Sequence, residues 1–188
     1  MRHKYDTRGI VLARTPLGEA NSLITLLTPT VGLVRARAQG IRKPGAKLAH
    51  GLTTLSESDV TLVQGKEGWR VVGAVLREQW AKVLTHEGRE RVARVSGLLL
   101  RLVVDEMREE RLFEEVGEFL TALRDRPSEL HEAIELLVVL RLLALLGLDA
   151  GEDAMTLRGY DAPLLQQVLE ARTSYIQRIN QDISASGL

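Results

Sequence analysis

Five cationic side chains follow one another between positions 35 and 47 of this chain: Arg35, Arg37, Arg42, Lys43 and Lys47. Arg and Lys are the side chains that neutralise phosphates, Arg through a planar fork of donors and Lys as a point charge. Residues 32–38 have the composition of a β-strand, in which alternate residues face the same side. Arg35 and Arg37 are therefore expected to project together, with the other three cations on the following loop. This spacing suits a polyanion backbone, and nucleic acid is the commonest one.

The same pattern has a structural interpretation that the sequence leaves open. Val34, Ala36 and Ala38 form the opposite, small and apolar face of the strand, which can pack into a barrel. Charged residues on an edge strand also protect a sheet from aggregation. Edge protection seldom requires five cations, so a DNA-binding strand and loop is the favoured interpretation.

The charge of the whole chain is divided between its two halves. Lys and Arg equal Asp and Glu in number, which gives a net charge of zero. Residues 1–84 nevertheless carry 13 basic and 6 acidic residues, a net charge of +7, and residues 85–188 carry 12 and 19, a net charge of −7. Such a field on one half of a protein attracts polyanions.

The elements that must position these cations change in character near residue 84. Short β-prone runs separated by Gly and Pro come first, and their spacing predicts a small five-stranded barrel. Helical periodicity follows. The strands are expected at residues 9–14, 22–28, 32–38, 58–64 and 69–75, with a hairpin turn at 65–68; the helices are expected at 87–110, 112–124, 128–146 and 161–183. We therefore predict an α+β protein, with a β-barrel domain in residues 1–80 and an all-α domain in residues 81–188.

Patterns that would indicate an enzyme are weak. His3, His50, His86 and His131 are scattered without metal-ligand spacing. A phosphate loop of the GxxxxGK[ST] type does not occur in the sequence. The acidic residues between 105 and 115 alternate with Arg108 and Arg111, which is typical of a salt-bridged helix surface. We expect a non-enzymatic protein with no cofactor and no metal ion.

Composition restricts the compartment and the mode of binding. The chain has no cysteine, its first residues do not resemble a signal peptide, and its longest apolar stretch, residues 133–148, contains Glu135 and Arg141. A cytoplasmic protein without membrane contact is expected. Aromatic residues are few in the first half, where Trp69 and Trp80 are expected to pack in the core rather than to stack on bases. Binding should then depend on phosphate contacts and on salt.

Several of these segments together resemble a known family. They are residues 9–12 (Gly-Ile-Val-Leu), 17–28 (Leu-Gly-Glu-Ala-Asn-Ser-Leu-Ile-Thr-Leu-Leu-Thr) and 32–40 (Gly-Leu-Val-Arg-Ala-Arg-Ala-Gln-Gly), followed by Arg42 and Lys43. The order is similar to the N-terminal domain of RecO-type recombination mediators over about residues 1–80, and more loosely beyond. The resemblance implies an OB-fold barrel followed by a helical domain. It also implies that Arg35, Arg37, Arg42 and Lys43 contact DNA.

The resemblance further implies a function in recombinational DNA repair, close to the nucleoid. RecO-type proteins bind single- and double-stranded DNA, anneal complementary strands and help to load RecA onto DNA covered by single-strand-binding protein. The implied partners are RecR and the acidic C-terminal tail of the single-strand-binding protein. Many members have a four-cysteine zinc module after the Leu-Gly that ends the long helix, where this chain has residues 149–155 without cysteine. This departure puts in doubt any partner contact that the zinc module supplies.

Two alternatives stay open at this point. The basic barrel can instead belong to a protein–protein adaptor that binds an acidic partner, with DNA contact incidental. Arg141, which lies among leucines, is a weaker candidate for binding the carboxylate end of a partner tail; an arginine in this setting more often keeps its charged end in water.

Overall fold

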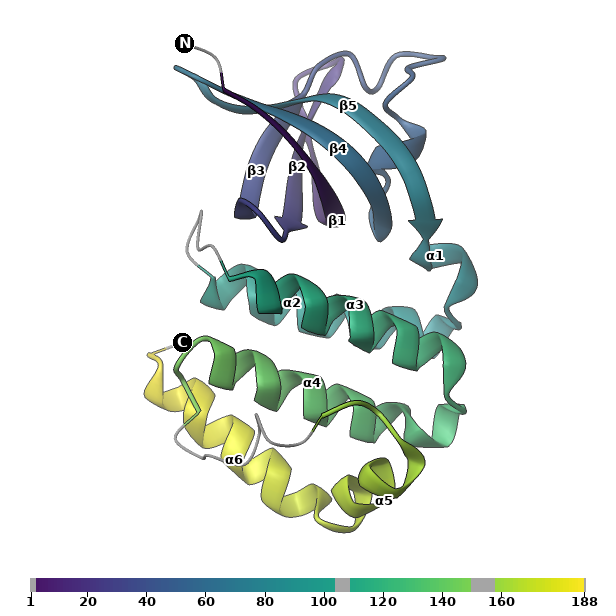
Figure 1. Cartoon of the computed structure of the whole chain (residues 1–188), viewed down its shortest axis with the longest axis vertical. Coiled ribbons are helices and arrows are strands. Elements are labelled where there is room, and N and C mark those ends of the chain that lie inside the picture. Colours follow the sequence, from purple (N-terminus) through teal and green to yellow (C-terminus); the bar gives the residue numbers. More distant parts are fainter. Residues whose placement is uncertain (1–2, 104–108, 150–157, 188) are drawn as a thin grey trace. The chain divides into compact units, whose positions relative to one another are not determined.

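The computed structural model describes residues 3–103, 109–149 and 158–187. Within it the chain divides into two compact units. The first contains Met1–Val83 with Val104–Phe113, and the second contains Leu84–Val103 with Glu114–Leu188. Figure 1 shows strands in the first unit and helices in the second. The predicted α+β class is confirmed.

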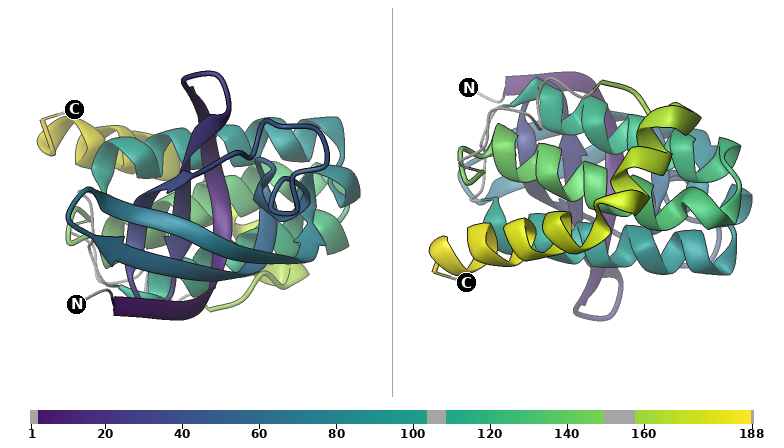
Figure 2. Two further views of the ribbon diagram at one scale, coloured as in Figure 1. Left: turned by 90° about the horizontal axis from the view of Figure 1, so that it is seen from above. Right: turned by 90° about the horizontal axis from the view of Figure 1, so that it is seen from below.

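The first unit is a closed five-stranded barrel. Its strands are β1 (His3–Leu17), β2 (Asn21–Thr28), β3 (Gly32–Ala38), β4 (Ser56–Gly65) and β5 (Gly68–Gln79), in the order β1-β2-β3-β5-β4. All neighbours are antiparallel except β3 and β5, which pair in parallel over a short stretch. A closed Greek-key barrel of five strands is the OB-fold, as the sequence predicted. Figure 2 (left) shows the turn between β1 and β2, in dark indigo, projecting from this barrel.

Alternation of side chains fills the interior of the barrel. On β3, Val34, Ala36 and Ala38 are at most 1% exposed, and they pack with Ile24 and Leu26 of β2. The 3₁₀ helix η1 (His50–Leu52) adds Leu52 to this core. Gly51 is required there because a Cβ atom would approach the Cβ of Ala74 to 3.1 Å and the Oγ of Ser58 to 3.2 Å.

The sequence located the strands but underestimated their length. β1 extends over His3–Leu17, well beyond the predicted residues 9–14, because its first half pairs with β4 and its second half with β2. A register shift between Val11 and Ala13 accompanies this change of partner. The predicted hairpin turn is confirmed, with Gly65 opposite Gly68.

Six helices and a second 3₁₀ helix are described after the barrel. They are α1 (Trp80–Val83), α2 (His86–Leu102), α3 (Glu110–Asp125), η2 (Ser128–Leu130), α4 (His131–Leu145), α5 (Ala162–Glu170) and α6 (Arg172–Ala185). Helix α4 is the central one of the second unit, apolar almost all round. Gly147, at a φ of +70°, follows its end as expected for a C-terminal cap. Asp161 caps α5 by accepting a hydrogen bond from the backbone N–H of Leu164 at 2.9 Å.

Two predicted helices were too long. Helix α2 ends at Leu102, short of the predicted residue 110, because Val103 is extended (φ −87°, ψ 115°). The helix predicted over residues 161–183 is two helices, because Ala171 (φ −93°, ψ 13°) leaves the helical conformation. Neither position has a Gly or Pro that would mark the end in the sequence. Residues 105, 106 and 108 of the predicted acidic surface, and most of the connector expected at 151–159, lie outside the described residues.

Within the described residues, helices of the length and apolarity needed to cross a bilayer do not occur.

Candidate nucleic-acid interface

Strand β3 presents two arginines on the outer face of the barrel. Arg35 is exposed and Arg37 is partly buried, whereas Leu33, which shares their face, is only 1% exposed. Their partners on β2 are Thr25 and Leu23, which carry no charge. Alternate residues of a strand lie roughly 7 Å apart, so the two guanidinium groups can contact successive parts of one extended polyanion.

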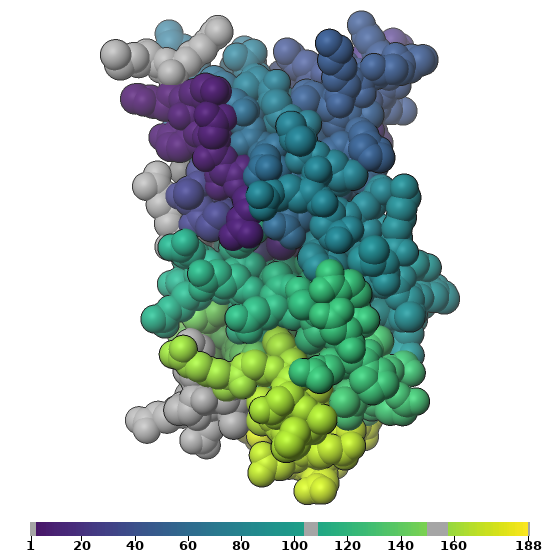
Figure 3. All heavy atoms as spheres, turned by 45° about the vertical axis from the view of Figure 1, so that its right-hand side comes forward, coloured from purple at the N-terminus to yellow at the C-terminus, as the bar shows by residue number. Residues whose placement is uncertain are grey.

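The three loop cations follow directly at the end of β3. Arg42, Lys43 and Lys47 are all exposed. The loop is held against the turn between β1 and β2, because the Arg42 N–H donates to the Ala20 carbonyl (3.0 Å) and the Gly40 N–H to Asn21 Oδ1 (2.9 Å). Figure 3 shows the segment that follows β3 as blue spheres at the upper right of the barrel surface. Hydrogen bonds thus fix where the loop begins, beside the strand.

Of the loop cations, Arg42 is the most constrained. Its Nη1 donates to the Gly18 carbonyl at 2.7 Å, which uses one of five guanidinium donors. In the part of the chain that the structure describes, Arg42, Lys43 and Lys47 have no carboxylate oxygen within 4.0 Å. Their charges are therefore not neutralised by an ion pair there.

A second strand, β5, contributes a cation that the sequence did not indicate. Arg70 on β5 lies in register with Arg37 on β3, flanked by Trp69 beside Ala36 and by Val71 beside Ala38. The flanking residues are buried, so Arg70 projects outward on the same face as Arg37. Arg70 was missed because the pairing of β3 with β5 is non-local. The alternation of Trp69, Arg70 and Val71 was the only signal in the sequence. It indicates that Arg70 points outward, but it does not indicate which strand lies beside it.

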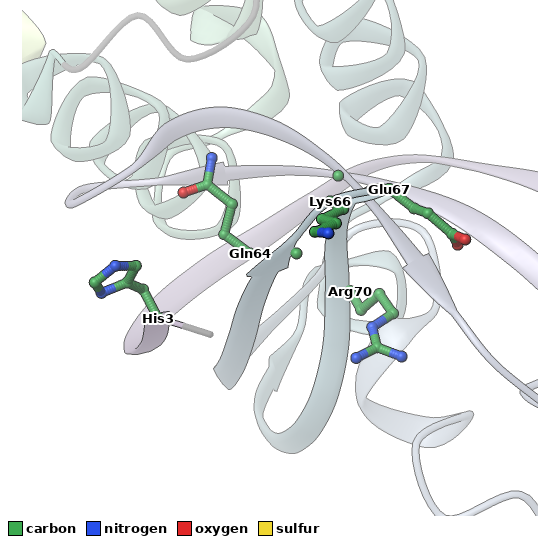
Figure 4. Close-up of a pocket in the computed structure, with 7 residues that line it drawn as sticks. His3, Gln64, Lys66, Glu67 and Arg70 are labelled. Atoms are coloured by element: carbon green, nitrogen blue, oxygen red, sulfur yellow. The ribbon is translucent and has the colours of Figure 1, made fainter. Parts of the chain in front are cut away.

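The hairpin between β4 and β5 borders an open depression of about 770 Å³. It is lined by His3, Gln64, Gly65, Lys66, Glu67, Gly68 and Arg70. Figure 4 shows Lys66, Glu67 and Arg70 on the hairpin, with His3 at the start of β1. The lining contains two cations, Lys66 and Arg70, and one carboxylate, Glu67. The depression therefore extends the basic face.

One acidic side chain of the barrel approaches Arg37 on this face. Glu67, 86% exposed at the tip of the hairpin, places Oε2 3.8 Å from Arg37 Nη1. An exposed pair at this distance contributes little to stability, about 0–1 kcal/mol at most. Arg37 is therefore accessible to a stronger anionic ligand.

The outer face of β1, β4 and the later part of β5 has a different charge pattern. Arg8 on β1 lies opposite Asp59 on β4, and Arg77 donates from Nε to the same carboxylate at 3.0 Å. Asp6 accepts a hydrogen bond from Thr61 (2.6 Å) and lies 3.0 Å from Lys4 Nζ. These two contacts lower the pKa of Asp6, the Thr61 hydrogen bond most. Here positive and negative charges alternate and neutralise one another.

The aromatic residues of the barrel belong to its packing. Trp69 is 7% exposed and contacts Tyr5 edge to face, with ring centroids 5.2 Å apart. Trp80 is 5% exposed and its Nε1 donates to Glu57 at 3.3 Å. Both tryptophans therefore lie in the core, as the sequence predicted. The arrangement supports contacts to phosphates more than stacking on bases.

Several arginines of the second unit are held in ion pairs. Arg141 is 3% exposed; its Nη1 donates to Glu115 Oε1 (3.0 Å), its Nη2 to the Gly159 carbonyl (2.7 Å), and its guanidinium lies 4.7 Å from the centre of the Tyr160 ring. The expectation that its charged end lies in water is wrong, because Glu115 supplies a buried counter-charge. The same pairing occupies the group that would bind a partner's carboxylate.

The histidines of the described residues do not form a metal-binding cluster with one another or with acidic residues. Among residues 3–103, 109–149 and 158–187, groups of three or more His, Asp or Glu close enough to share a metal ion do not occur. His131 is 1% exposed, with Nε2 3.0 Å from the Arg126 carbonyl. His86 lies on the surface, 3.7 Å from Glu90.

The strand order and the closed barrel define the first unit as an OB-fold domain with a basic outer strand and loop. Residues 1–76 match the family described as "Recombination protein O N terminal". The resemblance to RecO-type proteins is thereby confirmed for this domain.

Proteins named "DNA repair protein RecO" are similar to parts of the chain. The Synechococcus elongatus protein is 46% identical over 66 residues, which is 35% of this chain and 25% of that protein. The Dehalococcoides mccartyi (strain BAV1) protein is 39% identical over 64 residues, 34% of this chain and 25% of that protein. The Gloeothece citriformis protein matches more of the chain, with 27% identity over 150 residues, 78% of this chain and 53% of that protein. The chain thus spans between a quarter and about half of the length of these relatives.

Proposed function

We propose that this protein is a DNA-binding mediator of recombinational repair that acts without catalysing a reaction itself. The observation that carries the proposal is the basic strand and loop of the OB-fold, where Arg35 and Arg37 project from β3 and three exposed cations follow. The similarity of this domain to DNA repair proteins named RecO supports it. Arg35, Arg37, Arg42, Lys43 and Lys47 are the proposed DNA-binding residues.

Phosphate neutralisation gives this surface a mechanism. Two single strands repel each other through their phosphates, and cations along one strand reduce that repulsion. Complementary segments can then approach and pair without ATP. Because phosphate contacts carry no sequence information, binding should be nearly independent of sequence, which suits annealing of any complementary strands.

The partners follow from the same resemblance. RecO-type proteins assist the loading of RecA, together with RecR, onto DNA covered by single-strand-binding protein. We propose RecR and the acidic tail of the single-strand-binding protein as partners of this chain.

A fluorescence titration of a labelled oligonucleotide against salt tests the DNA-binding step. If about four phosphates are contacted, log K falls with log salt at a slope of roughly −3 for a single strand. Replacing Arg35, Arg37, Arg42 and Lys43 with Gln should remove most of the binding and flatten this slope. A control that replaces exposed Arg101, Arg111, Arg126 and Arg158 with Gln removes the same charge from elsewhere in the chain.

The outcome separates a DNA mediator from a protein adaptor. Equal loss of affinity in both four-residue variants would show a general charge effect and would contradict the proposed surface. Failure of the natural chain to bind at low salt, combined with binding of an acidic peptide, would favour the adaptor. An annealing assay with and without single-strand-binding protein then tests the mediator function directly.

A further inference from the structure

Two arginines of the barrel face lie side by side without a structural reason. Arg37 and Arg70 are register partners on the parallel strands β3 and β5, whose backbones are roughly 4.8 Å apart. Like charges in directly opposite positions destabilise a sheet. On the other outer face, the register partner of Arg8 is Asp59. A second like-charged register pair, Glu57 and Glu78 on β4 and β5, also occurs. There, however, Glu57 accepts a hydrogen bond from Trp80 Nε1 (3.3 Å) and lies 3.9 Å from Arg8 Nη1.

The row of register partners that passes through the pair contains one further cation, Lys4, which is paired with Asp6 at 3.0 Å. Register partners place Leu23 on β2, Arg37, Arg70, Val63 on β4 and Lys4 on β1 side by side. The row crosses the strands and contains no acidic residue. Lys66 lies on the adjoining hairpin, beside the same depression as Arg70. Within the described residues, Arg70 and Lys66 have no carboxylate oxygen within 4.0 Å.

One carboxylate shows where an anion can lie on this row. Glu67 Oε2 is 3.8 Å from Arg37 Nη1, although the Glu67 side chain is 86% exposed and extends from a hairpin tip. It is too far for a hydrogen bond. A backbone phosphodiester carries one negative charge on two non-bridging oxygens, and each oxygen can accept hydrogen bonds from one of the two guanidinium forks.

We propose that Arg37 and Arg70 together bind a single phosphate of the nucleic-acid strand and that Glu67 competes with it for Arg37. The nucleic-acid strand then crosses from β3 to β5 and continues to Lys66, rather than following β3 alone. This inference rests on the proposed DNA-binding function and adds Arg70, Lys66 and Glu67 to its surface. In this arrangement Arg70 strengthens DNA binding, whereas Glu67 on the same hairpin weakens it.

Three single variants test it in the full chain with the labelled oligonucleotide. Arg70→Gln should weaken binding about tenfold, as loss of a charge-assisted contact does, and should reduce the steepness of the salt slope by roughly 0.7. Glu67→Gln should strengthen binding about two- to fivefold at low salt, because a weak surface pair is removed. Arg77→Gln is the matched control on the same strand. Arg77 is paired with Asp59, so its replacement should change affinity less than about twofold.

A double variant tests whether one phosphate is shared. If Arg37 and Arg70 bind the same group, the double variant Arg37→Gln, Arg70→Gln loses less affinity than the product of the two single losses. Multiplicative losses would overturn the shared contact. Circular dichroism melting separates folding from binding: removing one of two neighbouring like charges should leave the midpoint unchanged or raise it.

The two levels of the proposal fail differently. If the natural chain does not bind the oligonucleotide, the proposed function itself is wrong. If the natural chain binds and the four-residue strand and loop variant does not, the proposed function stands. If, in addition, Arg70→Gln and Glu67→Gln both behave like Arg77→Gln, only the inference on the hairpin is wrong.

Discussion

Several arginines of the helical unit are paired with carboxylates, whereas five cations of the described barrel surface are not. In the helical unit, Arg91 and Arg94 both bind Glu135 (2.6 Å), Arg141 binds Glu115 (3.0 Å) and Arg178 binds Asp149 (2.7 Å). On the barrel, Arg42, Lys43, Lys47, Lys66 and Arg70 have no carboxylate oxygen within 4.0 Å among the described residues. Both sets are cationic, but among the described residues only the first set is paired with carboxylates.

This difference separates two uses of the same residue type. An arginine with a buried carboxylate contributes to the fold, and its loss leaves an unpaired charge behind. An exposed cation without one costs little to replace and keeps its field available for a ligand. Variants of the helical arginine pairs should therefore change stability without changing DNA binding, and variants of the barrel cations should do the reverse.

The largest effect is expected at Arg141. Arg141→Leu should lower the free energy of unfolding by about 3–5 kcal/mol, because Glu115 is left as a buried charge without its partner. Burial and the neighbouring Glu115 carboxylate raise the pKa of Tyr160 well above its usual value, so the tyrosine hydroxyl stays protonated and still donates to Glu115 at 2.7 Å. Urea unfolding followed by circular dichroism measures the loss.

An exposed pair in the same unit provides the control. Arg172→Gln removes the partner of Glu132, and both side chains are more than a third exposed. Its cost should be about 0–1 kcal/mol. A cost as large as that of Arg141→Leu would show that burial does not distinguish these pairs.

A smaller loss of stability is expected at Glu135. Its carboxylate joins Arg91 and Arg94 of α2 to α4, with three hydrogen bonds of 2.6–2.7 Å. The hydrogen bond to Glu135 also raises the pKa of Arg94. Glu135→Gln should cost about 1.5–3 kcal/mol, the range for hydrogen bonds to charged groups. Part of this stabilisation is attraction between the Glu135 carboxylate and the two arginines, which salt screens. Raising the salt concentration should therefore reduce the difference in unfolding free energy between the natural chain and Glu135→Gln.

The barrel interior could be predicted from the sequence because its signals are local. Alternation placed Val34, Ala36 and Ala38 inside and Arg35 and Arg37 outside, and Gly65 and Gly68 marked the hairpin. The juxtaposition of Arg37 with Arg70 could not be predicted, because it depends on the register of two strands separated by more than thirty positions of sequence.

The helical unit shows the same limit. Asp161 caps the beginning of α5 with its side chain, and Gly147 follows the end of α4 with a positive φ. Both helix boundaries were predicted correctly. The ends at Val103 and Ala171 have no such residue, since Val and Ala are compatible with helix continuation. Arg141 was misjudged because its counter-charge, Glu115, comes from another helix.

Asp182 gives a pH-dependent test of the helical unit. Burial and the neighbouring Asp149 carboxylate raise the pKa of Asp182 above its usual value, and its Oδ2 is buried without a hydrogen-bond partner among the described residues. The folded state therefore binds this proton more tightly than the unfolded state, so stability falls as pH rises through the pKa of the folded state. Asp182→Asn should raise the melting midpoint at pH 7, and the difference should shrink toward pH 3.5. An equal difference at both pH values would contradict this assignment.

The smallest change in stability is expected where the largest change in DNA binding is expected. The contacts that the four-residue variant of Arg35, Arg37, Arg42 and Lys43 to Gln removes include that from Arg42 Nη1 to the Gly18 carbonyl and the weak pair of Arg37 with Glu67. Away from buried features, surface substitutions change stability by about 0.5 kcal/mol or less each. Neighbouring like charges are also removed, which offsets part of any loss. Circular dichroism melting should therefore give a midpoint close to that of the natural chain, and a collapse of the barrel in this variant would mean that these cations are structural.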